Sequence, residues 1–180
     1  MVKFIYNNTY FGYMDDIYKL DFGNKVALDS KDKKIIKQLQ LNARLSISEI
    51  ARKTGIPRDV VKYRIKRLEQ EKVIRFYHAF LNPSKLGVPM YTYVLFSLTN
   101  FDPETEKKFI SFLTSHKKII YVAKLSGNWD MGIGVCSKDF KDFDNVLFEI
   151  RTKFSSIIKE FHVGSVIDEY KYDYMVDLID

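Results

Sequence analysis

The spacing of apolar residues changes along the chain and divides it into a helical half and a mixed half. Between residues 28 and 75, apolar side chains recur three and four positions apart, which predicts three short amphipathic helices near 29–42, 46–55 and 57–71. From residue 90 onward, strand-like alternation is interrupted by stretches with helical spacing. The first half is typical of a winged or plain helix-turn-helix unit, and the second of a sheet with helices.

Short polar residues and one glycine mark the expected ends of the first two helices. Asp29 or Ser30 can cap the first helix and Ser46 or Ser48 the second, because their side-chain oxygens accept hydrogen bonds from unpaired backbone N–H groups. Gly55 supplies the left-handed residue that ends the second helix.

The third helix has an apolar stripe and a basic stripe. Pro57 suits its start, because proline lacks the N–H that a helix start leaves unpaired. Its apolar positions, on one side, are Val60, Val61, Ile65 and Leu68. The positions mostly on the other side are Arg58, Asp59, Lys62, Tyr63, Lys66 and Arg67. A helix that is anchored by one stripe and basic on the other is suited to a polyanion.

The second half predicts a four-stranded sheet with two helices. The expected strands cover residues 91–98, 119–125, 129–136 and 157–170, and the expected helices cover 103–114 and 140–154. This βαββαβ order is that of the ferredoxin-like split motif, so the expected fold class is α+β. Residues 73–81, between the halves, alternate and are predicted as a strand that links two domains.

These patterns divide the chain into five segments. They are an aromatic N-terminal extension (1–27), a helix-turn-helix domain (28–75), a linker strand and loop (76–89), a ferredoxin-like domain (90–172) and a C-terminal tail (173–180). The extension is too rich in Phe and Tyr for a solvated tail, and its pattern leaves open a strand near its start and a helical turn near its end. Its role is not determined by the sequence.

Composition excludes several classes of protein. With 46% hydrophobic and 15% aromatic residues among 180, the chain is not disordered, and no apolar run approaches the roughly 20 residues of a membrane helix. The first residues lack the basic start and apolar core of a secretory signal, so no membrane partner and a cytoplasmic location are expected. The lone Cys136 excludes an intramolecular disulfide and a cysteine-based metal cluster.

The positive charge is concentrated in the helical half. The whole chain carries a net charge of +6, whereas residues 29–75 contain fourteen Lys and Arg against six Asp and Glu, a net +8. The rest of the chain is therefore mildly acidic. Such a one-sided distribution favours a nucleic-acid partner.

Position along the third helix predicts different roles for its polar residues. In a helix-turn-helix unit the second helix of the motif enters the major groove, and its first residues face base edges. Here those residues are Arg58, Asp59, Lys62 and Tyr63. The cations expected to neutralise phosphates are Arg52, Lys53, Arg64, Lys66, Arg67 and Arg75. The predicted partner is therefore double-stranded DNA.

The sequence has few features of an enzyme. His78, His116 and His162 lack metal-ligand spacing, and there is no glycine-rich phosphate loop, nucleophile elbow or paired-carboxylate signature. No catalytic activity, metal or cofactor is predicted. Turn chemistry alone explains the hairpin sequence at 126–130.

An ordered series of motifs resembles the Lrp/AsnC family of leucine-responsive, or feast/famine, regulators. In the first half these motifs are Asp32, Lys34-Ile35-Ile36, Leu39, Ala43-Arg44-Leu45-Ser46, Glu49-Ile50-Ala51, Gly55-Ile56, Arg64-Ile65-Lys66-Arg67-Leu68-Glu69 and Val73-Ile74. In the second half they are Leu81-Asn82-Pro83, Lys85-Leu86-Gly87 and Ser126-Gly127-Asn128-Trp129-Asp130. The resemblance covers about residues 28–170.

The resemblance implies a DNA-binding transcriptional regulator with a C-terminal effector-sensing domain. It also implies a homodimer formed by stacked sheets, further assembly of dimers, and a small-molecule effector, usually an amino acid, at the contacts between dimers. The residues that match the family's effector loop are Ser126, Gly127, Asn128, Trp129 and Asp130.

Three features differ from the usual family pattern. Pro57 stands where Ser or Thr usually caps the third helix, and Asn128 and Trp129 give the effector loop one charge fewer and a larger ring. The aromatic extension is also additional. The alternatives are a sirohaem decarboxylase-like enzyme of the same architecture, a ligand-independent architectural DNA-binding protein and a stand-alone interaction module.

Overall fold

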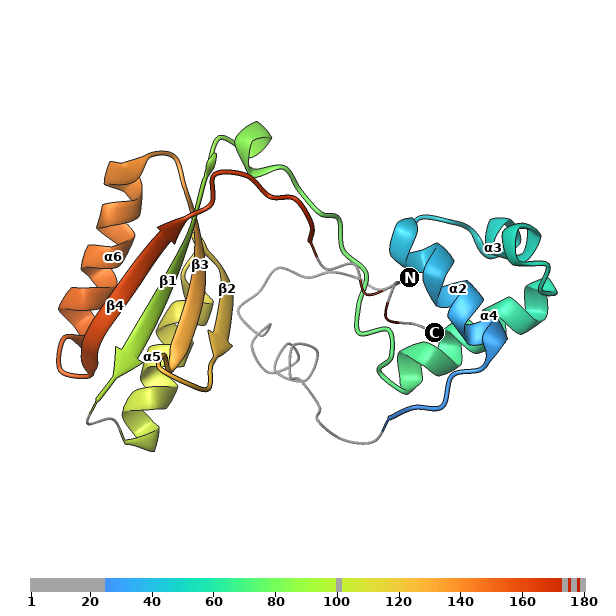
Figure 1. Ribbon diagram of the computed structural model, residues 1–180, viewed down its shortest axis with the longest axis horizontal. Coiled ribbons are helices and arrows are strands. Elements are labelled where there is room, and N and C mark those ends of the chain that lie inside the picture. The colour runs from blue at the N-terminus through green and yellow to red at the C-terminus, as the bar shows by residue number, and fades with distance from the viewer. Residues whose placement is uncertain (1–24, 100–101, 173–174, 176–177, 179–180) are drawn as a thin grey trace. The chain divides into compact units, whose positions relative to one another are not determined.

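The chain divides into two compact units in the computed structural model, which describes residues 25–99, 102–172, 175 and 178. The divisions fall between Ala79 and Phe80 and between Tyr170 and Lys171 (Figure 1). The strand and helical turn considered for the aromatic extension, and most of the C-terminal tail, lie outside the described residues.

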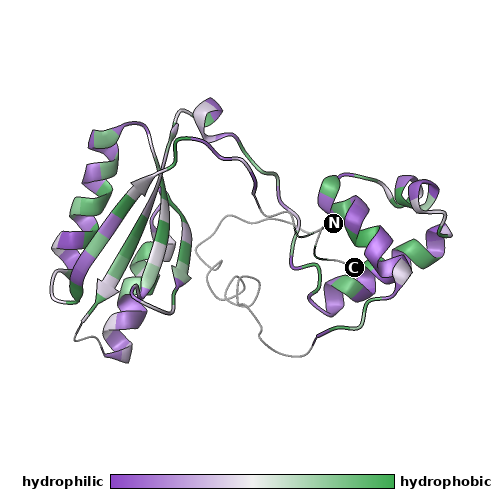
Figure 2. Cartoon of the chain, viewed as in Figure 1, coloured by the Kyte–Doolittle hydropathy of each residue, from purple (hydrophilic) through white to green (hydrophobic). Residues whose placement is uncertain are grey.

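The first unit is built from three helices around a small apolar core. Its helices are α2 (Ser30–Leu41), α3 (Ile47–Thr54) and α4 (Arg58–Gln70). Each helix contributes to a cluster of buried residues made of Ile35, Leu39, Ile50, Ile56 and Val61. Apolar residues alternate with polar ones along each helix, as Figure 2 shows, so each helix turns one face inward.

The predicted helix caps are confirmed. The Asp29 side chain accepts hydrogen bonds at the start of α2, and the Asp32 side chain accepts one from the Asp29 backbone N–H, which together form a capping box. Ser46 and Glu49 form the same arrangement at the start of α3. Gly55 ends α3 with a φ of 69°, a conformation in which glycine has no steric penalty.

The linker strand predicted over 73–81 is wrong. The backbone there belongs to no strand, because a strand needs a neighbouring one to pair its N–H and C=O groups, and all four described strands belong to the second unit. Tyr77 instead donates a hydrogen bond to Glu69 of α4 over 3.1 Å. The segment ends where predicted, at a short 3-10 helix (Pro83–Leu86) that is capped by the Asn82 side chain.

The second unit has the predicted βαββαβ order. Its strands are β1 (Met90–Leu98), β2 (Ile119–Lys124), β3 (Met131–Ser137) and β4 (Ile158–Ser165), and its helices are α5 (Pro103–Ser115) and α6 (Phe140–Phe154). The strands form an antiparallel sheet in the order β2-β3-β1-β4. This is the ferredoxin-like arrangement, and the α+β fold class is confirmed.

Two expected strand bounds are corrected. The strand expected from residue 129 begins at Met131, because Trp129 and Asp130 belong to the turn that precedes it. The strand expected to reach residue 170 ends at Ser165. The neighbouring strand β1 begins at Met90, so few of its residues remain to pair with β4 beyond the pair Thr92–Ser165. One further hydrogen bond, from the Val166 N–H to the Tyr91 carbonyl, extends this pairing.

One face of the sheet packs against both helices and forms the larger core. Val94 and Phe96 of β1 and Ile133 of β3 are fully buried there, with Phe109 from α5 and Ile150 from α6. The helices lie on this face of the sheet (Figure 1). Burial of these large apolar side chains supplies most of the unit's driving force for folding.

The opposite face of the sheet carries aromatic side chains. Tyr91 and Tyr93 of β1 point to this side, with ring centroids 4.9 Å apart and a hydroxyl–hydroxyl hydrogen bond of 3.1 Å. Gly134 of β3 lies opposite Tyr93, and a Cβ there would come within 2.8 Å of the Tyr91 ring. The absence of a side chain at Gly134 therefore allows the ring to lie close to the sheet.

Within the described ranges, no helix is long and apolar enough to cross a membrane. The same residues contain no group of three or more His, Cys, Asp or Glu side chains arranged to hold a metal ion.

Candidate nucleic-acid interface

Helix α4 presents an exposed basic stripe. Arg58, Lys62 and Lys66 recur every four residues, so with 3.6 residues per turn they share one face, and all three are exposed. Asp59 and Tyr63 border the stripe, and Tyr63 is 69% exposed. The structure therefore brings together five of the residues predicted to contact DNA.

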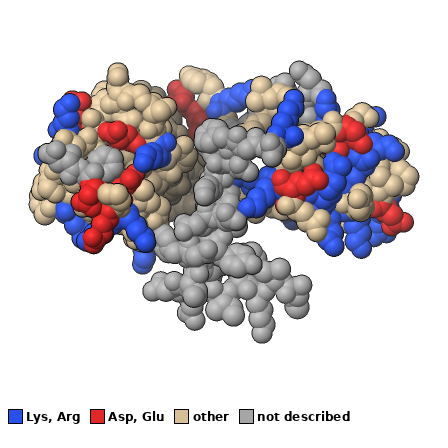
Figure 3. Space-filling model, turned by 90° about the horizontal axis from the view of Figure 1, so that it is seen from below, with Lys and Arg blue, Asp and Glu red and all other residues tan. Residues whose placement is uncertain are grey.

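The end of α3 adds two more exposed cations. Arg52 and Lys53 occupy its last turn, just before the Gly55 turn that leads into α4. Lys and Arg side chains gather on the surface of this helical unit, as Figure 3 shows. A surface with this density of positive charge attracts a polyanion over a range of about 10 Å at moderate salt.

The start of α4 is held without a side-chain cap. Pro57 is the N-cap residue and accepts no side-chain hydrogen bond, as expected from the absence of Ser or Thr there. Its carbonyl accepts the first helical hydrogen bond from the Val61 N–H at 3.0 Å, and Ile56 beside it is buried. The first turn of α4 therefore depends on this apolar anchor, and Asp59 adds a favourable charge near the helix N-terminus.

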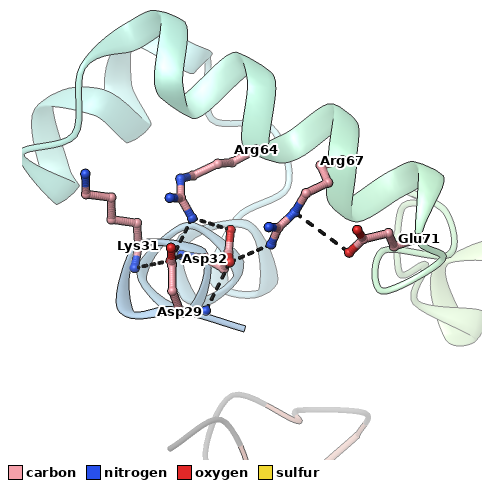
Figure 4. Close-up of polar contacts among 6 residues, drawn as sticks. All are labelled: Asp29, Lys31, Asp32, Arg64, Arg67 and Glu71. Carbon is pink, nitrogen blue, oxygen red and sulfur yellow. Dashed lines mark hydrogen bonds and ion pairs between the residues drawn. The ribbon is translucent and has the colours of Figure 1, made fainter. Parts of the chain in front are cut away.

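Arg64 and Arg67, also predicted to contact phosphates, lie on a different face of α4. Both side chains turn toward the first turn of α2 (Figure 4), where Arg64 Nη1 is 2.6 Å from Asp29 and 2.8 Å from Asp32. Arg67 Nη2 is 2.6 Å from Asp32. Only 17% of the Arg64 side chain and 30% of the Arg67 side chain are exposed. The structure thus does not bring these two arginines onto the exposed stripe.

The ion pair between Asp29 and Arg64 shifts the pKa values of both residues. The backbone N–H of Asp32 and then the Arg64 guanidinium lower the pKa of Asp29 from 3.8 to about 2, because both stabilise the carboxylate form. The hydrogen bond to Asp29 likewise raises the pKa of Arg64 above its ordinary value. Asp29 and Arg64 are therefore both charged at neutral pH.

Sequence reasoning gave Asp29 only a capping role and Asp32 only a place in the family motif, and it paired neither with an arginine. A detectable signal was present: Asp29 and Asp32 have the three-residue spacing of a capping box, and Arg64 and Arg67 have the three-residue spacing of one helix face. The pairing between them could not be read from the sequence, because it joins residues more than 30 positions apart.

The predicted effector loop is a compact hairpin turn between β2 and β3. Ser126, Gly127 and Asn128 are exposed, and Gly127 has a φ of 122°. The Asp130 carboxylate accepts a hydrogen bond from the Leu98 N–H at 2.7 Å, so it fastens the hairpin to the end of β1. The Trp129 ring is partly buried, 6.2 Å from that of His162. The five residues lie together, and Asp130 is already occupied within the fold.

A hollow of about 520 Å³ lies at α5 and α6, away from this hairpin. Its lining includes Phe112, His116, Lys118, Asn145 and Lys153, and it contains no residue of the predicted effector loop.

Comparisons with known proteins agree with this architecture. A family model described as winged helix-turn-helix DNA-binding matches residues 28–75. An HTH-type transcriptional regulator of Pyrococcus horikoshii is 32% identical over 133 residues, which are 74% of this chain and 82% of that protein. The leucine-responsive regulatory protein of Haemophilus influenzae is 29% identical over 73% of this chain and 80% of its own length. The chain belongs to the Lrp/AsnC family of transcriptional regulators.

Solved structures show the same fold. An AsnC family regulator from Agrobacterium tumefaciens has a TM-score of 0.73 at 23% identity, covering 81% of this chain and 94% of that one. A regulator from Neisseria meningitidis in complex with L-methionine has a TM-score of 0.74 at 20% identity, with the same coverage. The relatives are regulators, so the chain is a DNA-binding transcriptional regulator rather than the enzyme considered as an alternative.

The lowered pKa of Asp29 predicts a loss of stability in acid. The folded carboxylate stays charged to about pH 2, whereas the unfolded one protonates near its ordinary value of 3.8. Its stabilising contribution is therefore complete above about pH 4 and is lost as the pH falls toward 2. We expect the melting temperature, followed by circular dichroism, to decrease across this window.

Asp29→Asn tests the source of this effect, because it should make the decrease smaller. Asp168→Asn is the control, since Asp168 is an exposed carboxylate in the loop after β4, and it should keep the wild-type pH dependence. An Asp29→Asn variant that follows the wild-type curve would contradict the assignment.

Proposed function

We propose that this regulator contacts double-stranded DNA through the exposed stripe of α4 and the end of α3. Arg58, Asp59, Lys62 and Tyr63 would face base edges, Arg52 and Lys66 would contact phosphates, and the Lys62 ammonium group would also reach a phosphate. The observation that supports this assignment most is the spacing of the exposed cations Arg58, Lys62 and Lys66, which puts them together on one face of α4. Residues 28–75 are thus the proposed DNA-binding domain, and its site of action is the cytoplasm.

The dimensions of α4 suit this role. An α-helix with side chains is about 10–12 Å wide, and the major groove is about 12 Å wide. The side chains at the start of a recognition helix meet the base edges, and the cations further along reach the backbone. Arginine can bond a guanine with two parallel N–H donors, so Arg58 is the strongest candidate for direct base recognition.

Replacing exposed lysines of the stripe should weaken DNA binding and reduce its dependence on salt. Each lost phosphate contact lowers the slope of log K against log salt concentration by about 0.9. We expect Lys62→Ala and Lys66→Ala each to show this change in anisotropy titrations of the full chain. The probe is a duplex enriched from a random pool by the wild-type protein.

The matched control is Lys107→Ala, an exposed lysine of α5 in the second unit. It should leave both affinity and slope unchanged. If Lys62→Ala, Lys66→Ala and Lys107→Ala all behave like wild type, α4 is not the DNA-contacting surface. Wild-type protein that enriches no duplex at low salt would overturn DNA binding itself.

A homodimer formed through the open face of the sheet is the proposed functional unit. Tyr91, Tyr93 and Tyr121 provide aromatic surface on this side, and Tyr121 is 49% exposed. Aromatic residues are enriched at protein interfaces, and the face of a sheet can pack on a second copy of itself. Two-fold symmetry would also present two copies of α4 to successive major grooves. The proposed dimerisation domain covers residues 90–172, with residues 76–89 as the linker.

A charge on the open face should disrupt this dimer. Light scattering should give the wild type at least twice the chain mass of 21.2 kDa, and Tyr93→Glu should shift it toward the mass of one chain, because a carboxylate would be buried without a partner. Phe148→Glu is the control, since Phe148 is 66% exposed on α6. A Tyr93→Glu variant with the wild-type mass would contradict the proposed interface.

We further propose that a small molecule such as an amino acid binds at the hairpin of Ser126, Gly127, Asn128, Trp129 and Asp130. The support is the exposure of this loop and the L-methionine complex of the neisserial regulator, whose fold is shared. The Asn128 amide could hydrogen-bond a carboxylate or ammonium group, and Trp129 could pack against an apolar side chain. A regulator without an effector is the alternative.

The fluorescence of Trp129, the single tryptophan of the chain, offers a direct test. Titration of the full chain with L-methionine, and then with other amino acids, should change its emission and saturate. Asn128→Ala should abolish the change, whereas Asn145→Ala, in the hollow at α5 and α6, should not. Asp130→Ala is unsuitable, because it also removes the bond to Leu98. A flat titration with all twenty amino acids would favour the ligand-independent alternative.

A further inference from the structure

Helix α4 has three faces with different surroundings. With about 100° between successive residues, its side chains fall into three sets around the axis. The sets are the apolar residues Val61, Ile65 and Leu68, the exposed cations Arg58, Lys62 and Lys66, and the ion-paired residues Arg64, Arg67 and Glu71. The positive residues of one helix are thus divided between solvent and the interior of the unit.

The carboxylate of Asp32 is the centre of the ion-paired set. Its side chain has no solvent exposure, and one oxygen accepts from Arg64 Nη1 at 2.8 Å. The other oxygen accepts from Arg67 Nη2 at 2.6 Å and from the Asp29 N–H at 3.1 Å (Figure 4). A buried carboxylate is strongly unfavourable unless its charge is paired and its lone pairs are bonded. Asp32 therefore requires both guanidinium groups.

The same bonds limit what the two arginines can do. A guanidinium has five N–H donors, but the side chains of Arg64 and Arg67 are largely buried. Either arginine could reach a phosphate fully only by turning away from the buried carboxylate, which exchanges one ion pair for another. Arg64 is also bonded to Asp29, and Arg67 Nε lies 3.7 Å from Glu71. By contrast, Arg58, Lys62 and Lys66 form no ion pair with another residue that the structure describes.

We propose that Asp32 is a positioning residue that withholds Arg64 and Arg67 from DNA and uses them to fix the rotation of α4 on α2. The inference rests on the proposed function of α4. Asp32 itself contacts no DNA, and it acts by deciding which cations of α4 do. Phosphate contact is left to the exposed stripe, whose direction follows from the two ion pairs on the neighbouring face.

Neutralising Asp32 should change the mode of DNA binding as well as stability. Asp32→Asn keeps the side-chain shape but removes the charge, so Arg64 and Arg67 become available to phosphates and α4 loses its fixed rotation. In anisotropy titrations of the full chain across KCl concentrations, the salt slope should become steeper, by up to about 1.8 for two new phosphate contacts. The preference for the enriched duplex over a scrambled duplex should fall several-fold.

Replacing the arginines should have the opposite pattern to replacing the lysines. Arg64→Met and Arg67→Met should lower the melting temperature of the helical unit and leave the salt slope unchanged in protein that is still folded by circular dichroism. The matched variants Lys62→Met and Lys66→Met should lower the slope by about 0.9 each and keep the wild-type melting temperature. These four variants decide the proposal even if Asp32→Asn does not fold.

Two results would overturn the proposal. One is a lower salt slope in Arg64→Met and Arg67→Met with an unchanged melting temperature, which would make both arginines phosphate contacts. The other is folded Asp32→Asn with the wild-type slope and duplex preference, which would leave Asp32 a purely structural role. In both cases the lysine variants would still respond, so the proposed function of α4 would stand. A response in none of the variants would overturn the proposed function instead.

Discussion

A carboxylate without solvent access sets the geometry of the helical unit. Apolar contacts among Ile35, Ile50 and Val61 bring the three helices together, but such contacts are non-directional and tolerate rotation of one helix against another. Charge-assisted hydrogen bonds are directional, and those from Asp32 to Arg64 and Arg67 join the start of α2 to the second half of α4. The direction of the exposed basic stripe is a consequence of this junction.

Because of these ion pairs, the helical unit has fewer cations available to a partner than its Lys and Arg content suggests. The high positive charge of residues 29–75 includes two arginines that are neutralised within the unit. The ion-paired carboxylates are neutralised as well, so the exposed surface remains strongly positive. Composition therefore predicts the kind of partner, whereas the assignment of individual contacts requires the packed structure.

In the second unit, the packing of both helices on one face of the sheet determines which surface is left for other contacts. Helices α5 and α6 cover a single face of the sheet, and the other face carries Tyr91, Tyr93 and Gly134. The hairpin between β2 and β3 is held to β1 by Asp130. Asp130, which matches the family's effector loop in the sequence, thus forms a hydrogen bond within the fold. The exposed part of the loop is limited to Ser126, Gly127 and Asn128.

Local features were predictable to within a few residues. The helices α2, α3 and α6, and the caps of α2 and α3, follow from residues within one or two turns of each other, because capping and helical periodicity are local interactions. The strand expected over 73–81 was wrong, and the last strand ends earlier than expected, because a strand exists only where another strand pairs with it. Alternating polar and apolar side chains indicate a segment that can form a strand, but they do not provide the neighbouring strand that it must pair with.

The sequence by itself determined the family, the α+β order of elements, the concentration of positive charge and the exposed cations at the start of α4. The tertiary structure alone decided that Arg64 and Arg67 bind Asp32 rather than lie on that stripe, and that Asp130 binds the backbone of Leu98. The physical reason is distance along the chain. Helical periodicity and caps join near neighbours, whereas these ion pairs and hydrogen bonds join residues 32 to 35 positions apart, which only the packed core brings within 3 Å.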